Sequence, residues 1–455
     1  MVFANTNKSD YLNGDSSIAS KASIASNASK ASISSSVSKA LIITYYWPPS
    51  GGAGVQRWLK FSKYLPEYGW EPIVLTVDPE YASYPAIDTS LGKEVPADLK
   101  VIRTRATDWF RIYSSDKSKI PTAGFAKGTG NSFISKFSRF LRGNFFIPDP
   151  RRGWNRHAFR KACEIIEKEK IASFVTTSPP HSSQLIGLKL KERFPHLRWI
   201  ADLRDPWTDI YYYDLFYPTS ISKLIDRSYE KAVLKKADRI ITAGTLLLEL
   251  FEKKMPGISI KSTVITNGYD DADFEPANKK LPEIFTITYV GTLSEKYPVE
   301  GFTEALRMLS DKGIRYKARF VGTINDNVTD KIMSSVTGDS LEIIAYSPHD
   351  KAVSFMADSS LLVLIIPDAT DNRLIITGKI FEYIASQRPV LCIGPENGEA
   401  AGILRDLGAG ESFGYNDTAG IEGFIQKNLD KPVSLVTDHS AYSRRHLTGK
   451  LASVL

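Results

Sequence analysis

Residues 40–79 read ALIITYYWPPSGGAGVQRWLKFSKYLPEYGWEPIVLTVDP. The apolar runs at 41–44 and 73–77 have the length and composition of buried strands. Between them lies a helix whose apolar residues fall mostly on one face: Val55, Trp58, Leu59, Phe61, Tyr64 and Leu65. Strand, helix and strand in this order form a βαβ unit, which predicts an α/β fold with a parallel sheet.

A glycine-rich loop precedes this helix and contains Gly51, Gly52 and Gly54. These glycines let the backbone approach a ligand closely, and the N–H groups at the helix start can point at an anion or a hydroxyl. The loop is not a Walker sequence, because no Gly-Lys-Ser/Thr follows. Arg57 stands where a dinucleotide fingerprint has its last glycine, so we do not expect that fingerprint either.

A second informative stretch, TGKIFEYIASQRPVLCIGP, covers residues 377–395. Gly378 frees N–H groups at a helix N-terminus, and Lys379 adds a point charge suited to a diphosphate. Glu382, on the first helical turn, can accept hydrogen bonds from ribose hydroxyls. This order suits a nucleotide-sugar pocket, although an ordinary surface helix of an α/β protein has a similar pattern.

Further motifs follow an alternating strand and helix order, namely SPPHSSQLIG at 178–187, ADLRDPWTD at 201–209, ADRIITAG at 237–244, VITNGYD at 264–270 and ITYVGTLSEKYPVEGF at 287–302. With the two stretches above, this collinear set resembles the GT-B glycosyltransferases, specifically family 4-like members of the bacterial surface-polysaccharide type. The resemblance covers nearly all of the chain after residue 39. It implies two Rossmann-like domains that face each other across a cleft, the first holding the acceptor and the second the sugar nucleotide.

The chain length of 455 residues fits this arrangement. It is longer than a single hydrophobic core usually supports, and it suits two domains of about 150–200 residues each. Residues 1–39 are rich in Ser and Ala, and we expect a disordered tail there. We expect the remaining parts to be an acceptor domain at 40–270, a linker at 271–284, a sugar-nucleotide domain at 285–440 and a C-terminal helix near the domain junction at 441–455.

The segment ADLRDPWTD holds the best cluster of acid and base groups in the sequence: Asp202, Arg204, Asp205 and Asp209. The resemblance implies that the loop after this strand contacts the transferred sugar or the acceptor. Asp205 is therefore a catalytic candidate, as base, orienter or acceptor contact, and Arg204 and Trp207 are candidates for the acceptor side. An Asp–Arg salt bridge that only fixes the loop is the alternative.

His181 is the second catalytic candidate, because it follows Pro179 and Pro180 at the end of a predicted strand. Ligands of parallel sheets gather at such strand ends. An imidazole there can polarise a hydroxyl or contact a phosphate, with helix capping or packing as the alternative.

The donor side also includes the residues after the predicted strand at 285–289. Gly291 and Thr292 can turn toward the donor diphosphate, and Lys296 can neutralise it. Many members of the family that this chain resembles carry Arg directly after the glycine that corresponds to Gly291, where this chain has Thr292. Lys379 would then supply the second positive charge.

A second departure concerns the E-x7-E motif of that family. Leu374 stands eight residues before Glu382, where the motif has its first glutamate. That glutamate faces the transferred sugar in the family. Its loss leaves open which sugar is transferred and whether the protein is active.

The net charge of +7 is modest, and the densest basic region is at 133–160. A helix over 133–142 places Phe133, Phe137, Phe140 and Leu141 on one face, with Lys136, Arg139 and Arg142 beside it. This pattern predicts contact with a membrane surface, although the aromatic residues could instead pack on the first domain. No recognisable nucleic-acid-binding module is present, so we expect no nucleic-acid partner.

Several site types are not expected. No run of about 18 apolar residues is present, which predicts no transmembrane helix. Cys163 and Cys392 read as buried thiols of a reducing cytoplasm, so we expect a cytoplasmic protein, including a peripheral location at the inner face of the cell membrane. No histidine has metal-ligand spacing, and the resemblance implies a retaining, metal-independent reaction without a cofactor.

The resemblance therefore implies a hexosyltransferase-like glycosyltransferase. It would move a sugar from a nucleotide-diphosphate sugar to a glycan or lipid-linked acceptor in surface-polysaccharide biosynthesis. Two alternatives stay open: a noncatalytic GT-B-like binding or scaffold protein, which the two departures favour, and a GT-B sugar-nucleotide epimerase.

Overall fold

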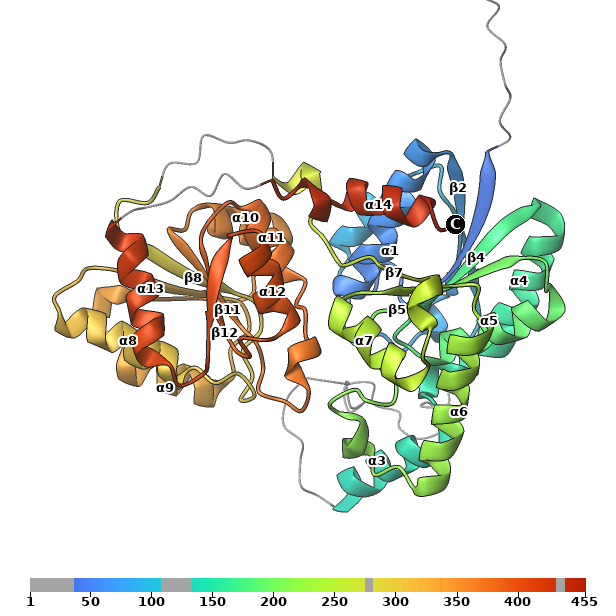
Figure 1. Cartoon of the computed structure of the whole chain (residues 1–455), viewed down its shortest axis with the longest axis horizontal. Helices are drawn as coiled ribbons and strands as arrows, with labels where there is room; N and C mark the ends of the chain where they lie inside the picture. The colour runs from blue at the N-terminus through green and yellow to red at the C-terminus, as the bar shows by residue number, and fades with distance from the viewer. Residues whose placement is uncertain (1–36, 108–132, 275–280, 337, 431–437) are drawn as a thin grey trace, which may run out of the picture. The chain divides into compact units, whose positions relative to one another are not determined.

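The computed structural model describes residues 37–107, 133–274, 281–336, 338–430 and 438–455 (Figure 1). The fold described below is that of residues 37–455. The predicted tail lies almost wholly outside the described residues. Within residues 37–455 the strands form two parallel sheets, which confirms the α/β fold class.

The first sheet has seven strands in the order β3-β2-β1-β4-β5-β6-β7. Their bounds are β1 Ser38–Ile43, β2 Trp70–Val77, β3 Lys100–Thr104, β4 Ile171–Ser178, β5 Arg198–Leu203, β6 Arg239–Thr242 and β7 Ser262–Val264. The helices of this half are α1 Ala53–Tyr64, α3 Phe133–Phe145, α4 Asn155–Glu169, α5 Ser182–Arg193, α6 Ser220–Lys236 and α7 Thr245–Lys254. The strand order reverses between β1 and β4, which makes this sheet doubly wound.

The second sheet has six strands in the order β10-β9-β8-β11-β12-β13. Their bounds are β8 Thr286–Val290, β9 Lys317–Val321, β10 Leu341–Ile344, β11 Leu361–Ile365, β12 Val390–Ile393 and β13 Gly410–Phe413. The helices are α8 Glu300–Asp311, α9 Asp326–Ser335, α10 His349–Ala357, α11 Lys379–Ala385, α12 Glu399–Asp406 and α13 Thr418–Asp430. Here the order reverses between β8 and β11.

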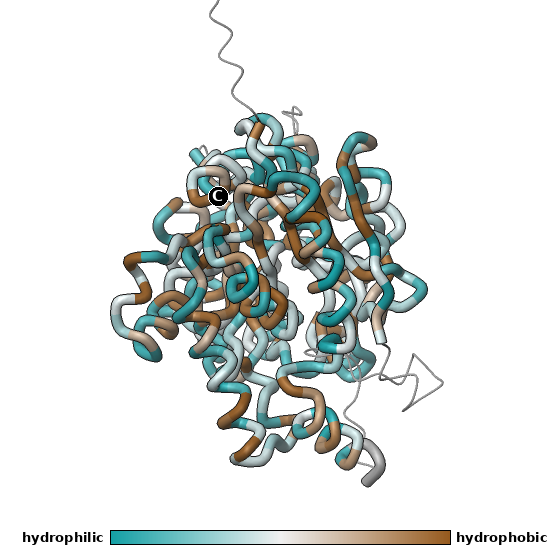
Figure 2. The backbone as a smooth tube through the Cα atoms, turned by 90° about the vertical axis from the view of Figure 1, so that its right-hand side faces the viewer, coloured by the Kyte–Doolittle hydropathy of each residue, from teal (hydrophilic) through white to brown (hydrophobic). Residues whose placement is uncertain are grey.

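Both sheets are buried on their two faces, which explains why their strands read as continuous apolar runs. In β1, Leu41 and Ile43 belong to one hydrophobic cluster, while Ala40 and Ile42 belong to the cluster on the opposite face. The hydropathy colouring of Figure 2 shows long hydrophobic runs at strands, whereas many helical turns alternate between hydrophobic and hydrophilic. Full burial of each large apolar side chain contributes about 1.5–3 kcal/mol to folding.

The first strand begins earlier than the predicted domain start at residue 40. Ser38 and Lys39 pair in parallel register with Trp70 and Glu71 of β2, so backbone hydrogen bonding extends the strand beyond its apolar run. At the other end of the chain, helix α14 (Arg444–Ala452) packs against α1 of the first half (Figure 1).

The predicted linker is only partly described. Its first residues, Asp271–Asp273, form a single 3-10 turn, and residues 275–280 lie outside the described part. The described part of the chain contains no helix whose length and hydropathy would let it cross a bilayer.

Candidate functional site

Two glycines of the second half, Gly291 and Gly322, lie at the carboxyl ends of β8 and β9. Gly291 follows β8 with φ +133°, a conformation that L-residues with a side chain rarely adopt. A β-carbon at this position would come within 2.7 Å of Lys379 Nζ. Gly322 follows β9, and a β-carbon there would lie 2.2 Å from the carbonyl oxygen of Gly291. Both positions therefore require glycine, beside the point where the strand order of this sheet reverses.

The ammonium group of Lys379 lies directly over this glycine. Its Nζ donates a hydrogen bond of 2.8 Å to Tyr289 Oη and lies 4.3 Å from the centroid of the Tyr289 ring. Burial lowers the pKa of Lys379 to about 7. Among the described residues, no carboxylate forms an ion pair with Lys379. The ammonium is thus a partly desolvated cation held at a strand end, and an arriving anion would stabilise it.

Glu382 lies one helical turn after Lys379 on α11. Burial raises the pKa of its carboxyl group. Its carboxylate makes no side-chain hydrogen bond within the described parts of the chain, and it borders a small cavity together with His349 and Arg444. His349 Nε2 lies 3.0 Å from Asp273 Oδ2, and this hydrogen bond raises the pKa of His349 to about 9. The acceptor oxygens of Glu382 are therefore available to hydroxyl groups.

The other predicted donor residues have different surroundings. Gly378 has an ordinary helical φ of −57°, so its backbone does not demand a glycine. Thr292 is exposed, and its carbonyl oxygen accepts a 2.9 Å hydrogen bond from Tyr289 Oη. Lys296 is exposed and lies 5.5 Å over the ring of Tyr211, in the segment that follows β5.

The glycine loop of the first half, with Gly51, Gly52 and Gly54, packs closely against neighbouring loops. Gly52 has φ +106° and caps α1, a conformation that favours glycine. Gly54 packs against Arg204, since a β-carbon at 54 would lie 1.9 Å from Arg204 Nη1. Gly51 packs against Asp88, with 3.1 Å between its would-be β-carbon and the Asp88 β-carbon. The loop is thus shaped by close packing with Arg204 as well as by backbone conformation.

Arg204 connects the ends of two strands. Its Nε donates to the carbonyl oxygen of Ser178 at 3.1 Å, and its Nη2 donates to that of Pro179 at 2.9 Å. Arg204 therefore holds the loop after β4 against the loop after β5. It does so through carbonyl groups and not through the predicted Asp–Arg salt bridge.

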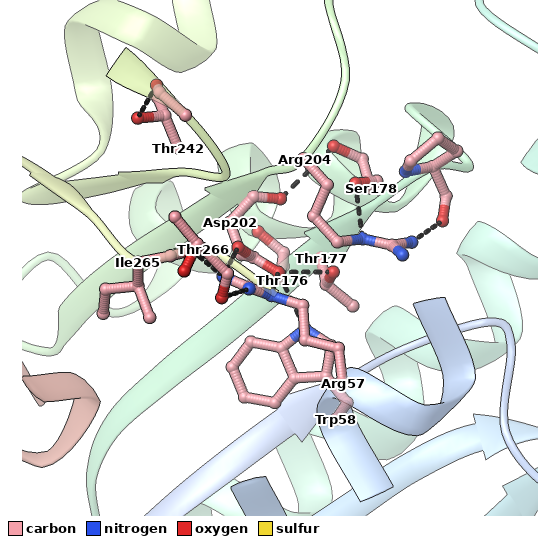
Figure 3. Close-up of polar contacts among 12 residues, drawn as sticks. Arg57, Trp58, Thr176, Thr177, Ser178, Asp202, Arg204, Thr242, Ile265 and Thr266 are labelled. Atoms are coloured by element: carbon pink, nitrogen blue, oxygen red, sulfur yellow. Dashed lines mark hydrogen bonds and ion pairs between the residues drawn. The ribbon is translucent and has the colours of Figure 1, made fainter. Parts of the chain in front are cut away.

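Asp202 differs from the other acidic residues of ADLRDPWTD, because its carboxylate is fully buried and paired inside the first half while its charge still acts on Asp205. Figure 3 shows Asp202 at the centre of a buried network, where its Oδ1 lies 3.0 Å from Arg57 Nη2. Trp58 Nε1 and Thr177 Oγ1 donate to Asp202 Oδ2 at 2.7 and 2.8 Å. Asp202 is the fifth residue of β5 and is enclosed by the start of α1, so its carboxylate serves structure. Arg57, in place of the fingerprint glycine, supplies its counter-charge.

Asp209 has a partner of its own, because it pairs with Lys254 of α7. Asp205 is partly buried, and burial raises the pKa of its carboxyl group. Within the described residues its side chain forms no hydrogen bond. Its charge acts on Tyr211 and Tyr212, where it contributes to the raised pKa of each phenol. Of the carboxylates of this segment, Asp205 is thus the one available to a ligand.

His181 is stacked on Trp207, with 4.9 Å between ring centroids and an angle of 15° between the planes. It occupies the N-cap position of α5 but makes no capping hydrogen bond. Both ring nitrogens are buried and have no hydrogen-bond partner in the described structure. Burial lowers the pKa of His181 to about 3, so its imidazole is neutral at physiological pH.

A pocket of about 170 Å³ opens beside this stack, and we call it the aromatic pocket. Its lining includes Tyr46, Arg142, Arg151, His181, Trp207 and Tyr212. The residues come from the segments after β1, β4 and β5, from α3 and from the 3-10 turn Pro150–Trp154 that follows it, so the pocket lies at the carboxyl edge of the first sheet beside its switch point. Pockets of α/β proteins concentrate at such points.

No protein-family model matches the chain, and no curated protein matches it. Solved structures do match. Sucrose-phosphate synthase from Thermosynechococcus elongatus matches with a TM-score of 0.56 and 14% identity, over 92% of this chain and 94% of that one. HepE of Anabaena, solved in complex with UDP, matches with a TM-score of 0.56 and 12% identity, over 91% and 94% of the two chains. The chain has the GT-B fold.

The GT-B fold also includes enzymes of another kind. A putative UDP-N-acetylglucosamine 2-epimerase from Listeria monocytogenes matches with a TM-score of 0.52 and 11% identity, over 91% of this chain and 94% of that one. At such identities the likeness establishes the fold alone. The function of this GT-B chain must therefore be argued from its own residues.

Sequence reasoning did not identify most of the aromatic pocket. Tyr46, Arg151 and Tyr212 lie in loops whose course only the folded chain reveals. The run of three tyrosines at 211–213, next to ADLRDPWTD, was the one local signal. Cys163 is partly exposed and not fully buried as predicted, whereas Cys392 is buried. Among the described residues, no group of three or more metal-ligating side chains is assembled.

Proposed function

We propose that this protein is a glycosyltransferase that transfers a sugar from a nucleotide-diphosphate sugar to a glycan or lipid-linked acceptor. The observation that carries the proposal is the position of Lys379, whose ammonium group lies over Gly291 at the end of β8 without a carboxylate partner among the described residues. A desolvated cation above a glycine is suited to a diphosphate, since the phosphate can approach the backbone and the lysine at once.

Glu382 adds the second recognition element of the donor. Its unpaired carboxylate, one turn after Lys379, would accept hydrogen bonds from the ribose hydroxyls. The spacing of three residues on α11 places a cation for the phosphates and an acceptor for the ribose on neighbouring positions of one helix. This arrangement supports a nucleoside diphosphate better than a free phosphate or a sugar alone.

In the proposed reaction Lys379 stabilises the diphosphate as it leaves the sugar. Such preorganised charge is often the largest contribution to catalysis. Because Thr292 stands where many members of the resembling family have an arginine, Lys379 and Lys296 would supply the positive charge for the diphosphate. We further propose that the reaction retains the anomeric configuration and needs no divalent ion, as the family 4-like sequence pattern implies.

The first half would present the acceptor. Asp205 supports this role because its carboxylate is unpaired in the described structure and lies beside Tyr211, over which Lys296 of the second half is placed. Asp205 would orient the attacking hydroxyl or accept its proton. His181 would contribute as a neutral imidazole beside the acceptor.

A membrane-facing surface is a further part of the proposal and would suit a lipid-linked acceptor of surface-polysaccharide biosynthesis. Helices α3 and α6 expose large apolar side chains, among them Phe137, Phe140, Ile221 and Leu224. Lys136 and Arg227 are exposed on the same two helices. Apolar side chains rimmed by basic ones bind the interface of an anionic bilayer. We name the four apolar residues the α3–α6 patch, and infer a cytoplasmic, peripheral location.

The first experiment is a thermal-shift screen of the full chain against UDP, GDP, ADP, CMP and their common sugar conjugates. Ligand that binds the folded state raises its melting temperature. We expect one nucleoside diphosphate and its sugar conjugates to give a shift in the wild type, which Lys379→Gln reduces strongly. Lys427→Gln is the matched control, because Lys427 forms an exposed ion pair with Glu411 on the same half.

The responding sugar nucleotide then separates the three functions. A transferase consumes it only in the presence of an acceptor, apart from slow hydrolysis, whereas an epimerase converts it without one. A binding or scaffold protein would show the thermal shift but no consumption in either case. No shift with any nucleotide would contradict the proposed donor site itself.

A further inference from the structure

The small cavity that Glu382 borders has a volume of about 10 Å³, and we call it the Glu382 cavity. A cavity of this size has room for about one water molecule. Charged groups in its wall therefore act on one another with little water between them, where electrostatic interactions are stronger than at an open surface. The titratable side chains of the wall, apart from Tyr269, are Lys60, Glu94, Asp270, Asp273, His349, Glu382 and Arg444.

Most of these groups have a direct partner of opposite charge. Lys60 donates hydrogen bonds to Glu94 and to Asp270. His349 Nε2 lies 3.0 Å from Asp273 Oδ2, and this hydrogen bond raises the pKa of His349 to about 9. The imidazole is therefore protonated at neutral pH, and each of these five groups is held by a partner inside the cavity.

Glu382 and Arg444 are the two charges that remain. Within the described residues, neither side chain forms a hydrogen bond or an ion pair, and Arg444 Nη1 is a buried donor without an acceptor. Arg444 is only 3% exposed. Burial and the positive charge of Arg57 lower its pKa to about 9, whereas the charge of Glu382 acts to raise it. The guanidinium group thus stays charged at neutral pH, and Glu382 is its nearest uncommitted counter-charge in the cavity wall.

The protonation state of Glu382 decides what its carboxyl group offers to a ribose. An ionised carboxylate accepts hydrogen bonds at both oxygens, whereas a protonated one carries a donor of its own. Burial raises the pKa of Glu382. The positive charge of His349 opposes this shift, but its partner Asp273 acts on Glu382 with the opposite sign. Arg444 opposes the shift without such a compensating partner, and Lys379 adds a smaller effect in the same direction.

The backbone of Arg444 is anchored independently of its side chain. Its N–H group donates to the carbonyl oxygen of Tyr269 at 2.8 Å, and its own carbonyl oxygen accepts from Thr448 Oγ1 at 2.7 Å. Ser443 caps α14 through its side chain, and α14 packs against α1. The guanidinium group therefore reaches the cavity from a fixed helix end, and a change of side chain leaves these backbone contacts in place.

We propose that Arg444 is a positioning residue of the donor site, which holds Glu382 as an ionised acceptor for both ribose hydroxyls. The inference rests on the proposed function and adds the C-terminal helix to the donor site. It follows that the preference for a ribonucleotide over a deoxyribonucleotide depends on a residue that acts on the nucleotide only through Glu382.

The test compares ligands that differ only in the ribose. UDP and dUDP, GDP and dGDP, and ADP and dADP are titrated pairwise into the full chain by calorimetry at pH 7. Both members of a pair carry the same diphosphate, so the ratio of their dissociation constants does not depend on the charge of Lys379. One hydrogen bond to a charged group corresponds to a ratio of about tenfold or more.

We expect the wild type to prefer at least one ribonucleotide over its deoxy partner by at least about tenfold, and Arg444→Gln to lose most of that preference. Arg444→Met removes the charge as well and keeps an apolar stem, so the result does not depend on the folding of a single variant. Arg444→Lys keeps the charge and should restore much of the preference. Arg445→Gln is the matched control and should retain it, because Arg445 is the next residue and forms a surface ion pair with Glu67.

A double variant shows whether Arg444 acts through Glu382. Glu382→Gln alone should lose the ribose preference, and the addition of Arg444→Gln should change the ratio no further. A preference that survives in both Arg444→Gln and Arg444→Met would overturn the inference. Equal losses in Arg444→Lys and Arg444→Gln, or an equal loss in Arg445→Gln, would overturn it too.

Thermal shift with the ribonucleotides, measured on the same samples, separates this result from failure of the proposed function. A shift that Lys379→Gln removes, together with an unchanged preference in the Arg444 variants, rejects the role of Arg444 alone. The same shift without any ribose preference in the wild type rejects the inference and leaves the diphosphate site. Absence of a shift with every nucleotide rejects the proposed donor site itself.

Discussion

Lys379 lies so close to Gly291 that a β-carbon on residue 291 would come within 2.7 Å of the lysine Nζ. The two residues are 88 positions apart in the sequence, one after β8 and the other at the start of α11. The strand order brings them together, because β8 and β11 are neighbours and the segment after β11 leads to α11. Cation and glycine thus form one ligand-binding unit at the switch point of the sheet.

Gly291→Ala should weaken nucleotide binding. The added methyl group would displace the ammonium group of Lys379, and the φ of +133° would be strained in alanine. We expect a loss of affinity of at least about tenfold and a destabilisation of roughly 1–3 kcal/mol. Calorimetric titration and chemical unfolding measure the two effects.

Gly313→Ala is the control for backbone strain. Gly313 has φ +72° and no atom within 4 Å of a would-be β-carbon. This variant should lose about 1–2 kcal/mol of stability and keep its nucleotide affinity. If both glycine variants retained nucleotide binding, the contact between Gly291 and Lys379 would have no role in the site.

Nucleotide affinity should fall as the pH rises through 7. A diphosphate binds the charged form of Lys379, whose pKa is lowered to about 7 by burial, so the competent fraction decreases above that pH. Between a pH well below 7 and pH 8.5 the dissociation constant should rise by about thirtyfold, the limit for a single lysine. Titration from pH 6.5 to 8.5 measures this slope.

Lys379→Arg provides the matched comparison for the pH effect. A guanidinium group keeps its charge throughout this range, so the pH dependence should disappear in the variant even if its affinity differs. A wild-type affinity that stays constant between pH 6.5 and 8.5 would show that Lys379 does not bind the phosphates.

Asp202→Asn should destabilise the first half without a direct effect on ligands. The substitution leaves the fully buried Arg57 without its counter-charge, although Arg57 keeps hydrogen bonds to the carbonyl oxygens of Ile265 and Thr266. Breaking a buried pair typically costs about 3–5 kcal/mol. Asp209→Asn, which disrupts a half-exposed pair with Lys254, should cost less than about 1 kcal/mol. Similar unfolding free energies for the two variants would show that the buried network contributes little.

Polar substitution of the α3–α6 patch should weaken binding to membranes. A double variant, Phe137→Ser with Leu224→Ser, removes two apolar side chains that are 52% and 70% exposed. We expect sedimentation with vesicles of anionic lipid to fall at least about tenfold, because each side chain contributes roughly 1.5–3 kcal/mol when buried in the bilayer. Tyr346→Ser is the control, since Tyr346 is 73% exposed on the second half. Equal sedimentation of wild type and double variant would rule out this surface.

The fold could be predicted from the periodicity of apolar residues and from the order of strands and helices along the chain. The apolar runs of β1 and β2 and the amphipathic face of α1 were readable, because burial on both faces of a parallel sheet leaves a continuous hydrophobic signal. Strand ends were less readable. Ser38 and Lys39 belong to β1 through backbone hydrogen bonds alone, which no side-chain pattern records.

The site was predictable only where its residues lie close in the sequence. Lys379 and Glu382 share one helical turn, so their spacing already indicated a common site. Asp202 accepts hydrogen bonds from Arg57 and Trp58, which are more than 140 residues away in the sequence, so the local segment did not reveal its buried network. The aromatic pocket combines segments that are far apart in the sequence with parts of α3 and α6, so only the folded chain reveals it.

Calorimetric titration of the wild type and of Lys379→Gln with the nucleoside diphosphate selected by the thermal-shift screen tests the donor site most directly. We expect saturable binding with one site per chain in the wild type and in Lys427→Gln, and an affinity at least about tenfold weaker in Lys379→Gln. Equal affinity in wild type and Lys379→Gln, or no binding of any nucleoside diphosphate, would contradict it.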